Sequence, residues 1–175
     1  KCSAASRAYI PKSLWNQTIN HITEMMKTVK MGDVRDFSNF VNAVIDEKSF
    51  DNIAGYIERA QKSKDAEIVL GGKYDKSKGY FVEPTIILAK TPNYESLVEE
   101  IFGPVFTVYV YEDDKYAETL KLCDQTSPYA LTGSIFSKDR YAMNEAFEAL
   151  RYAAGNFYLN DKPTGAVVGN QPFGG

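Results

Sequence analysis

The sequence has 175 residues, 44% of them apolar and 13% aromatic, so it can fold around a hydrophobic core and does not have the composition of a disordered chain. Its 20 Lys and Arg against 23 Asp and Glu give a net charge of −3, and these charges are scattered along the chain. This pattern argues against nucleic acid or an anionic membrane surface as a partner, and no apolar run reaches the length of a membrane span.

The first predicted elements are a short strand and an amphipathic helix. The strand covers residues 8–10 and stops at Pro11, which cannot donate a hydrogen bond to a neighbouring strand. The helix begins after Ser13 as its predicted cap and ends near Gly32. Its apolar stripe consists of Trp15, Ile19, Ile22, Met26 and Val29.

A second amphipathic helix and a buried strand follow. Asp46 and Ser49 are candidate caps of this helix. Its buried stripe consists of Phe50, Ile53, Ile57 and Ala60. The strand covers Ala66–Leu70, and the chain then turns at Gly71 and Gly72.

The second half of the chain continues the alternation of strands and helices. The expected elements are extended segments at 80–82 and 85–88, a strand at 105–111, a helix from Asp113 through Cys123, a strand at 134–136, a helix at 139–150 and a strand at 156–159. Such alternation predicts an α/β fold with a mostly parallel sheet, formed by a single domain.

Cys2 is the first candidate for chemistry. A thiol reacts as its thiolate, and the positive charges of Lys1 and Arg7 nearby in sequence would favour that form. The alternative is an ordinary small residue near a chain end.

The other cysteine and the only histidine do not suggest a second site. Cys123 falls on the apolar side of a predicted helix and is expected to be an inert, buried thiol. His21 has no acidic or thiol partner nearby in sequence and is expected to lie at the surface. The sequence has no Cys or His cluster with metal-ligand spacing.

Three ordered motifs carry a family resemblance. They are Lys-Cys-Ser-x-x-Ser-Arg at 1–7, Glu-Ile-Phe-Gly-Pro-Val at 100–105 and Gln-Pro-Phe-Gly-Gly at 171–175. In this order they resemble the aldehyde dehydrogenase superfamily, and the resemblance covers essentially the whole chain. Segments 79–84 and 154–162, together with 113–116, are similar to the branch of that superfamily that oxidises glutamate γ-semialdehyde.

The resemblance implies an activity and a set of site residues. The activity would be NAD-dependent oxidation of glutamate γ-semialdehyde, the open form of pyrroline-5-carboxylate, to glutamate in proline breakdown. Cys2 would attack the aldehyde, giving a thiohemiacetal and then a thioester. Ser3 would help to hold the substrate carboxylate, Glu100 would bind the nicotinamide ribose, and Phe102 would pack near the nicotinamide ring.

Each of these residues also has a simpler interpretation. Ser3 could be a turn hydroxyl, and Phe102 could be a core side chain. Glu100 could belong to a solvated acidic face together with Glu95 and Glu99, and Glu99 fits that interpretation best.

The resemblance further implies that residues 1–175 are a three-layer catalytic domain, with helices on both faces of the sheet, cut from a longer chain. No Gly-rich dinucleotide fingerprint is present, so the nucleotide-binding domain would be absent. The family's water-activating glutamate and oxyanion asparagine would lie upstream of Cys2. The isolated chain is therefore expected to be inactive, while the whole enzyme would be a homo-oligomer of the mitochondrial matrix.

Three other functions stay open. One is an aldehyde dehydrogenase with a different substrate. The second is a cysteine hydrolase or acyltransferase, which would need a histidine to accept the thiol proton and has only His21 available. The third is a non-catalytic α/β interaction module in which Cys2 is incidental.

Overall fold

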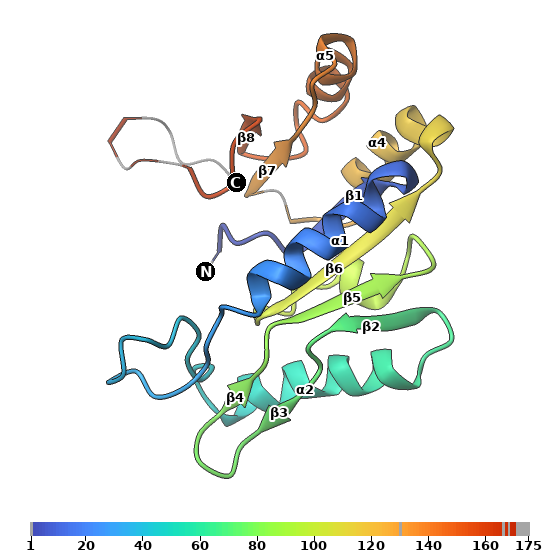
Figure 1. Ribbon diagram of the computed structural model, residues 1–175. Coiled ribbons are helices and arrows are strands. Elements are labelled where there is room, and N and C mark those ends of the chain that lie inside the picture. Colours follow the sequence, from blue (N-terminus) through green and yellow to red (C-terminus); the bar gives the residue numbers. More distant parts are fainter. Residues whose placement is uncertain (1, 130, 166, 168, 171–175) are drawn as a thin grey trace.

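The computed structural model describes residues 2–129, 131–165, 167 and 169–170, and its main feature is a four-stranded sheet with helices on both faces (Figure 1). The strand order is β1-β6-β5-β2. The strands are β1 (Arg7–Pro11), β2 (Ala66–Leu70), β5 (Thr85–Ala89) and β6 (Val105–Tyr111). β1, β6 and β5 run parallel, and β2 is antiparallel to β5. The predicted α/β fold with a mostly parallel sheet is confirmed.

The two long helices cover opposite faces of this sheet. Helix α1 (Lys12–Met26) crosses one face, and α2 (Glu47–Lys62) lies on the other (Figure 1). Along a strand, alternate side chains point to opposite faces, so Ile87 contributes to the core beneath α2 while Ile86 points the other way. The predicted three-layer arrangement therefore holds.

Helix α2 supplies the largest part of the core. Asp46 caps it by accepting a hydrogen bond from the Ser49 backbone N–H at 2.7 Å, as the sequence predicted. Its buried residues are Phe50, Ile53, Ala54, Tyr56, Ile57 and Ala60. They pack against Ile87 of β5 and Val105 of β6, which anchors α2 on these two strands.

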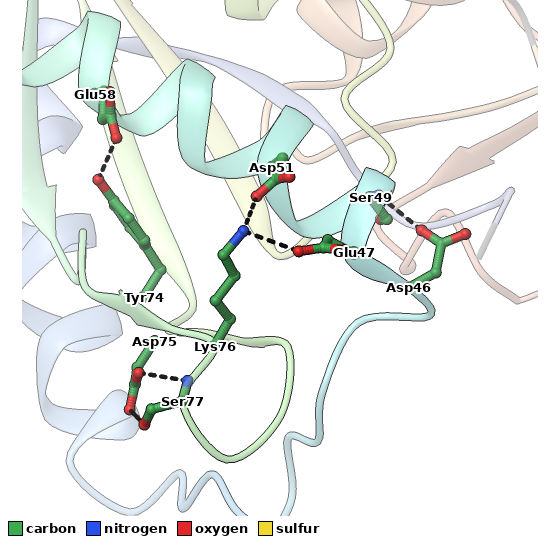
Figure 2. A network of polar contacts seen from close by, with 9 residues as sticks. All are labelled: Asp46, Glu47, Ser49, Asp51, Glu58, Tyr74, Asp75, Lys76 and Ser77. Carbon is green, nitrogen blue, oxygen red and sulfur yellow. Dashed lines mark hydrogen bonds and ion pairs between the residues drawn. The ribbon is translucent and has the colours of Figure 1, made fainter.

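A small hairpin is tied to the exposed side of α2. It consists of β3 (Tyr74–Asp75) and β4 (Phe81–Val82). Figure 2 shows the contacts: Lys76 Nζ lies 2.9 Å from Asp51 Oδ1 and 3.1 Å from Glu47 Oε1, and the Tyr74 hydroxyl donates to Glu58 at 2.7 Å.

The C-terminal part forms a second, smaller sheet with its own helices. Strands β7 (Thr132–Ile135) and β8 (Asn156–Leu159) pair in parallel as a separate two-stranded sheet. Helices α4 (Tyr116–Gln125) and α5 (Arg140–Ala149) contribute to the cluster packed around it. The buried residues of this cluster are Leu120, Ala146 and Leu150.

Two predictions about helix ends and short elements were wrong. Ser13 does not cap α1, because its hydroxyl and backbone N–H both donate to the carboxylate of Asp113, and α1 ends at Met26 rather than near Gly32. The helix expected from Asp113 begins as a short 3-10 helix at Asp113–Lys115, and the sequence did not give the bounds of the one-turn helix α3 (Glu95–Val98). Within the described part of the chain, no helix is long and apolar enough to cross a membrane.

Candidate active site

The two segments predicted to carry the chemistry lead into neighbouring strands at the same edge of the sheet. Cys2 lies in a turn before β1, and Glu100 and Phe102 lie in the loop before β6. β1 and β6 are parallel neighbours with Arg7 opposite Thr107, so their amino ends lie side by side. The topology therefore brings the candidate nucleophile and the candidate cofactor-binding residues to one edge, although about a hundred residues separate them in sequence.

The Cys2–Ser3 turn exposes the first of its two side chains and leaves the second half-buried. Cys2 is an exposed, free thiol. The carbonyl oxygen of Ser3 accepts a hydrogen bond from the Thr132 hydroxyl at 3.4 Å, which ties the turn to the start of β7. Among the described residues the Ser3 hydroxyl has no partner, so it is free to bind a ligand.

The Arg7 side chain makes its contacts inside the fold. Its guanidinium donates to the Leu97 carbonyl oxygen at 3.5 Å. Burial raises the pKa of the Cys123 thiol, and the positive charge of Arg7 opposes part of that rise. Cys123 is partly buried, less than the sequence predicted, and packs against the second core cluster. The sequence-based expectation that Arg7 acts on Cys2 stays a prediction.

Among the described residues, the histidine makes no contact that would support hydrolase chemistry. His21 is exposed on α1, and its Nδ1 lies 3.0 Å from the Gln17 carbonyl oxygen. In the ranges that the structure describes, no group of three His, Cys, Asp or Glu side chains could hold a metal ion.

The three glutamates before β6 differ in what they contact. Glu95 accepts from Arg59 Nε at 2.9 Å and 3.0 Å, and Glu99 accepts from the Tyr56 hydroxyl. Glu100 is exposed and makes no hydrogen bond or ion pair with any described residue. Glu99 and Glu100 are both exposed, as a solvated acidic face would be, whereas Glu95 is half-buried. Residues of α2 contact Glu95 and Glu99, which distinguishes both of them from Glu100.

Phe102 is turned out of the core. Its exposed fraction is 58%, and its backbone has a φ of 59°, a conformation uncommon for a bulky residue. On either side of it, Ile101 is buried and Gly103 packs so closely on Ile53 that a Cβ there would come within 2.4 Å of Ile53 Cδ1. Phe102 is therefore not part of the core that the described residues form.

The polar loop after β8 is anchored to the end of β7. Asn160 has a φ of 55°; its Oδ1 accepts from the Ser137 N–H at 2.9 Å, and its Nδ2 donates to the Ser137 carbonyl at 3.0 Å. This loop begins at the carboxyl end of a strand, which is where ligands bind in most open α/β sheets. Cys2 and Glu100, in contrast, precede the amino ends of their strands. Lys1 and the motif at 171–175 lie outside the described residues.

A family profile for the aldehyde dehydrogenase family matches residues 1–175, and the chain belongs to that family. Within it, the chain is similar to delta-1-pyrroline-5-carboxylate dehydrogenases. The mitochondrial enzymes of Dictyostelium discoideum and Homo sapiens are 66% and 54% identical to it, over 175 and 176 residues respectively. Each match covers 100% of this chain and 31% of the relative.

Solved structures give the same result. The delta-pyrroline-5-carboxylate dehydrogenase from Mycobacterium tuberculosis has a TM-score of 0.92 and 47% identity, covering 100% of this chain and 32% of that one. The 1-pyrroline-5-carboxylate dehydrogenase from Thermus with bound NAD has a TM-score of 0.85 and 33% identity, covering 99% and 32%. The chain thus spans about a third of the length of these relatives, at identities high enough to extend the likeness beyond the fold.

Proposed function

We propose that the whole protein oxidises glutamate γ-semialdehyde to glutamate with NAD, and that this chain supplies its nucleophile. The observation that carries the proposal is that three exposed side chains precede neighbouring parallel strands at the same edge of the sheet. They are the thiol of Cys2, the carboxylate of Glu100 and the ring of Phe102. The names of the relatives, several of them mitochondrial and three of the solved ones with bound NAD, support the substrate, the cofactor and a place in the mitochondrial matrix.

The residues at this edge fit the nicotinamide end of NAD. A carboxylate accepts hydrogen bonds from the two ribose hydroxyls, and the free carboxylate of Glu100 has no competing partner among the described residues. The exposed ring of Phe102 offers a flat apolar surface for the nicotinamide. When bound, NAD accepts the hydride that leaves the substrate carbon.

Cys2 and Ser3 of this chain act on the substrate itself. The thiolate of Cys2 attacks the aldehyde carbon and forms a C–S bond, giving a thiohemiacetal. Loss of hydride from that carbon leaves a thioester on Cys2, and water then cleaves the C–S bond, which releases the acid and restores the thiol. The Ser3 hydroxyl, one residue away, donates to the substrate's distal carboxylate.

The activity is a property of the whole protein in this proposal. The chain spans 31% of its relatives, and its sequence contains no Gly-rich phosphate-binding loop. We therefore expect the 175-residue chain alone to bind NAD weakly and to turn over no aldehyde. We also expect the whole protein to be a homo-oligomer, which light scattering would measure.

NADH formation by the full-length protein tests the proposal. Pyrroline-5-carboxylate, succinate semialdehyde and a simple alkyl aldehyde are offered separately, to the wild type, to Cys2→Ser and to Cys123→Ser as the matched control. We expect strong preference for pyrroline-5-carboxylate, lost in Cys2→Ser and retained in Cys123→Ser. Turnover of only the other aldehydes would favour an aldehyde dehydrogenase with a different substrate, and no NADH from any of them would favour the non-catalytic module.

A further inference from the structure

The short helix α3 depends on α2 for its position. It has four residues, and a single helical turn is unstable alone because nucleation costs more than one hydrogen bond returns. α2 holds both ends of it: Arg59 pairs with Glu95 at the start, at 2.9 Å, and the Tyr56 hydroxyl donates to Glu99 just past the end. The path of the chain out of α3 is therefore set by α2.

That path leads directly to the candidate cofactor residues. Glu99, held by Tyr56, precedes Glu100, and buried Ile101 follows it, so the backbone of Glu100 is fixed on both sides while its side chain is free. Phe102 comes next, between Ile101 and the close-packed Gly103.

We infer that Tyr56 is a positioning residue for NAD: through Glu99 it fixes the segment that carries Glu100 and Phe102, without itself contacting the cofactor. The inference rests on the proposed role of Glu100. Tyr56 is suited to this part because it is 7% exposed and the Arg59 guanidinium lies 4.5 Å from its ring centroid. Among the described residues, the partner of its hydroxyl is Glu99.

The contact is maintained over the working range of pH. The hydrogen bond to Glu99, together with burial, raises the pKa of Tyr56 to about 12, so its hydroxyl stays protonated and keeps donating at neutral and mildly alkaline pH.

The experiment compares two Tyr→Phe variants of the full-length protein. Tyr56→Phe removes the bond to Glu99. Tyr74→Phe is the matched control, because it removes a Tyr–Glu hydrogen bond of 2.7 Å to Glu58 on the same helix, on the hairpin side (Figure 2). The measurements are the NAD Kd by calorimetry, kcat, KM for NAD and the thermal midpoint.

We expect Tyr56→Phe to raise the NAD Kd and KM about three- to tenfold, because a loop that is correctly placed for only part of the time binds proportionally more weakly. Its kcat should stay within about twofold of the wild type, since the bound complex restores the loop. Tyr74→Phe should leave NAD binding unchanged. Glu99→Gln, which retains an acceptor for Tyr56, should show a smaller rise in Kd than Tyr56→Phe.

Two results would overturn the inference. One is wild-type NAD affinity in Tyr56→Phe while Glu100→Gln weakens binding. The other is an equal loss of NAD affinity and of thermal midpoint in Tyr56→Phe and Tyr74→Phe, which would mean general destabilisation of α2. Failure of the proposed function looks different, because Glu100→Gln itself would then bind NAD like the wild type.

Discussion

Substituting Gly103 with alanine should destabilise the fold through a clash with a single buried side chain. An added Cβ would lie 2.4 Å from Ile53 Cδ1, 2.6 Å from Cγ1 and 3.3 Å from Cγ2. Carbon atoms prefer separations of about 3.5–4.0 Å, so one side must move by about 1 Å. Ile53 is fully buried and cannot move into solvent. Overpacking of this kind costs about 1–3 kcal/mol, and we expect Gly103→Ala to lose about 2 kcal/mol of unfolding free energy.

A double-mutant cycle separates the clash from other effects. Ile53→Ala removes all three contacting carbons and alone should cost about 2–5 kcal/mol, through lost burial and the cavity left behind. In that background Gly103→Ala has no clash. It also restricts the unfolded chain, which contributes about 0.4–1 kcal/mol in its favour. The effect of Gly103→Ala should therefore change sign.

Urea unfolding of the 175-residue chain, followed by the fluorescence of its only tryptophan, Trp15, measures all four corners of the cycle. The predicted coupling between Gly103 and Ile53 is about 2 kcal/mol or more. Wild-type stability in Gly103→Ala, or simple additivity in the double variant, would refute the packing argument, and with it the account of how Phe102 is turned outward.

Three further predictions follow from single contacts. Asp46→Ala removes the cap on the Ser49 N–H and should cost about 1 kcal/mol in urea unfolding, whereas Asp46→Asn should restore most of it; equal losses would argue against capping. Iodoacetamide should alkylate exposed Cys2 much faster than Cys123, whose burial raises its pKa, and peptide mass spectrometry would show equal rates if this were wrong. Folding raises the pKa of Tyr56 to about 12, so the contribution of its hydroxyl to the free energy of unfolding is complete below about pH 10 and is lost toward about pH 12. The difference in unfolding free energy between wild type and Tyr56→Phe should therefore be smaller at about pH 11 than at about pH 9. An equal difference at the two pH values would contradict this.

Local pattern was sufficient for the elements with clear boundaries. β2, β6 and β8 have the predicted bounds, because each is a run of apolar or aromatic residues ended by Gly, an acidic pair or a polar turn. Helix α2 and its cap at Asp46 were predictable from the spacing of apolar residues and a carboxylate just ahead of them.

The elements that sequence analysis missed depend on contacts distant in sequence. Ser13 is drawn away from capping α1 by Asp113, 100 residues further along the chain. Helix α3 has too few residues for any periodicity and is held by Arg59 and Tyr56 of α2.

The site shows the same division. Motifs singled out Cys2, Glu100 and Phe102, but their common edge follows from the pairing of β1 with β6, which no local pattern encodes. The difference between bonded Glu99 and free Glu100 likewise appears only once α2 packs beside them. Sequence analysis did not single out Tyr56, because its hydroxyl matters only through a partner 43 residues away.

The most direct test of the account is the location of the acyl group during turnover. The full-length protein is mixed with pyrroline-5-carboxylate and NAD, quenched in acid within a single turnover, and digested with trypsin. The proposed mechanism requires a glutamyl thioester on the peptide of residues 2–7, which contains Cys2 and no other cysteine. An acyl group on the peptide that contains Cys123, or full turnover by Cys2→Ser, would contradict it.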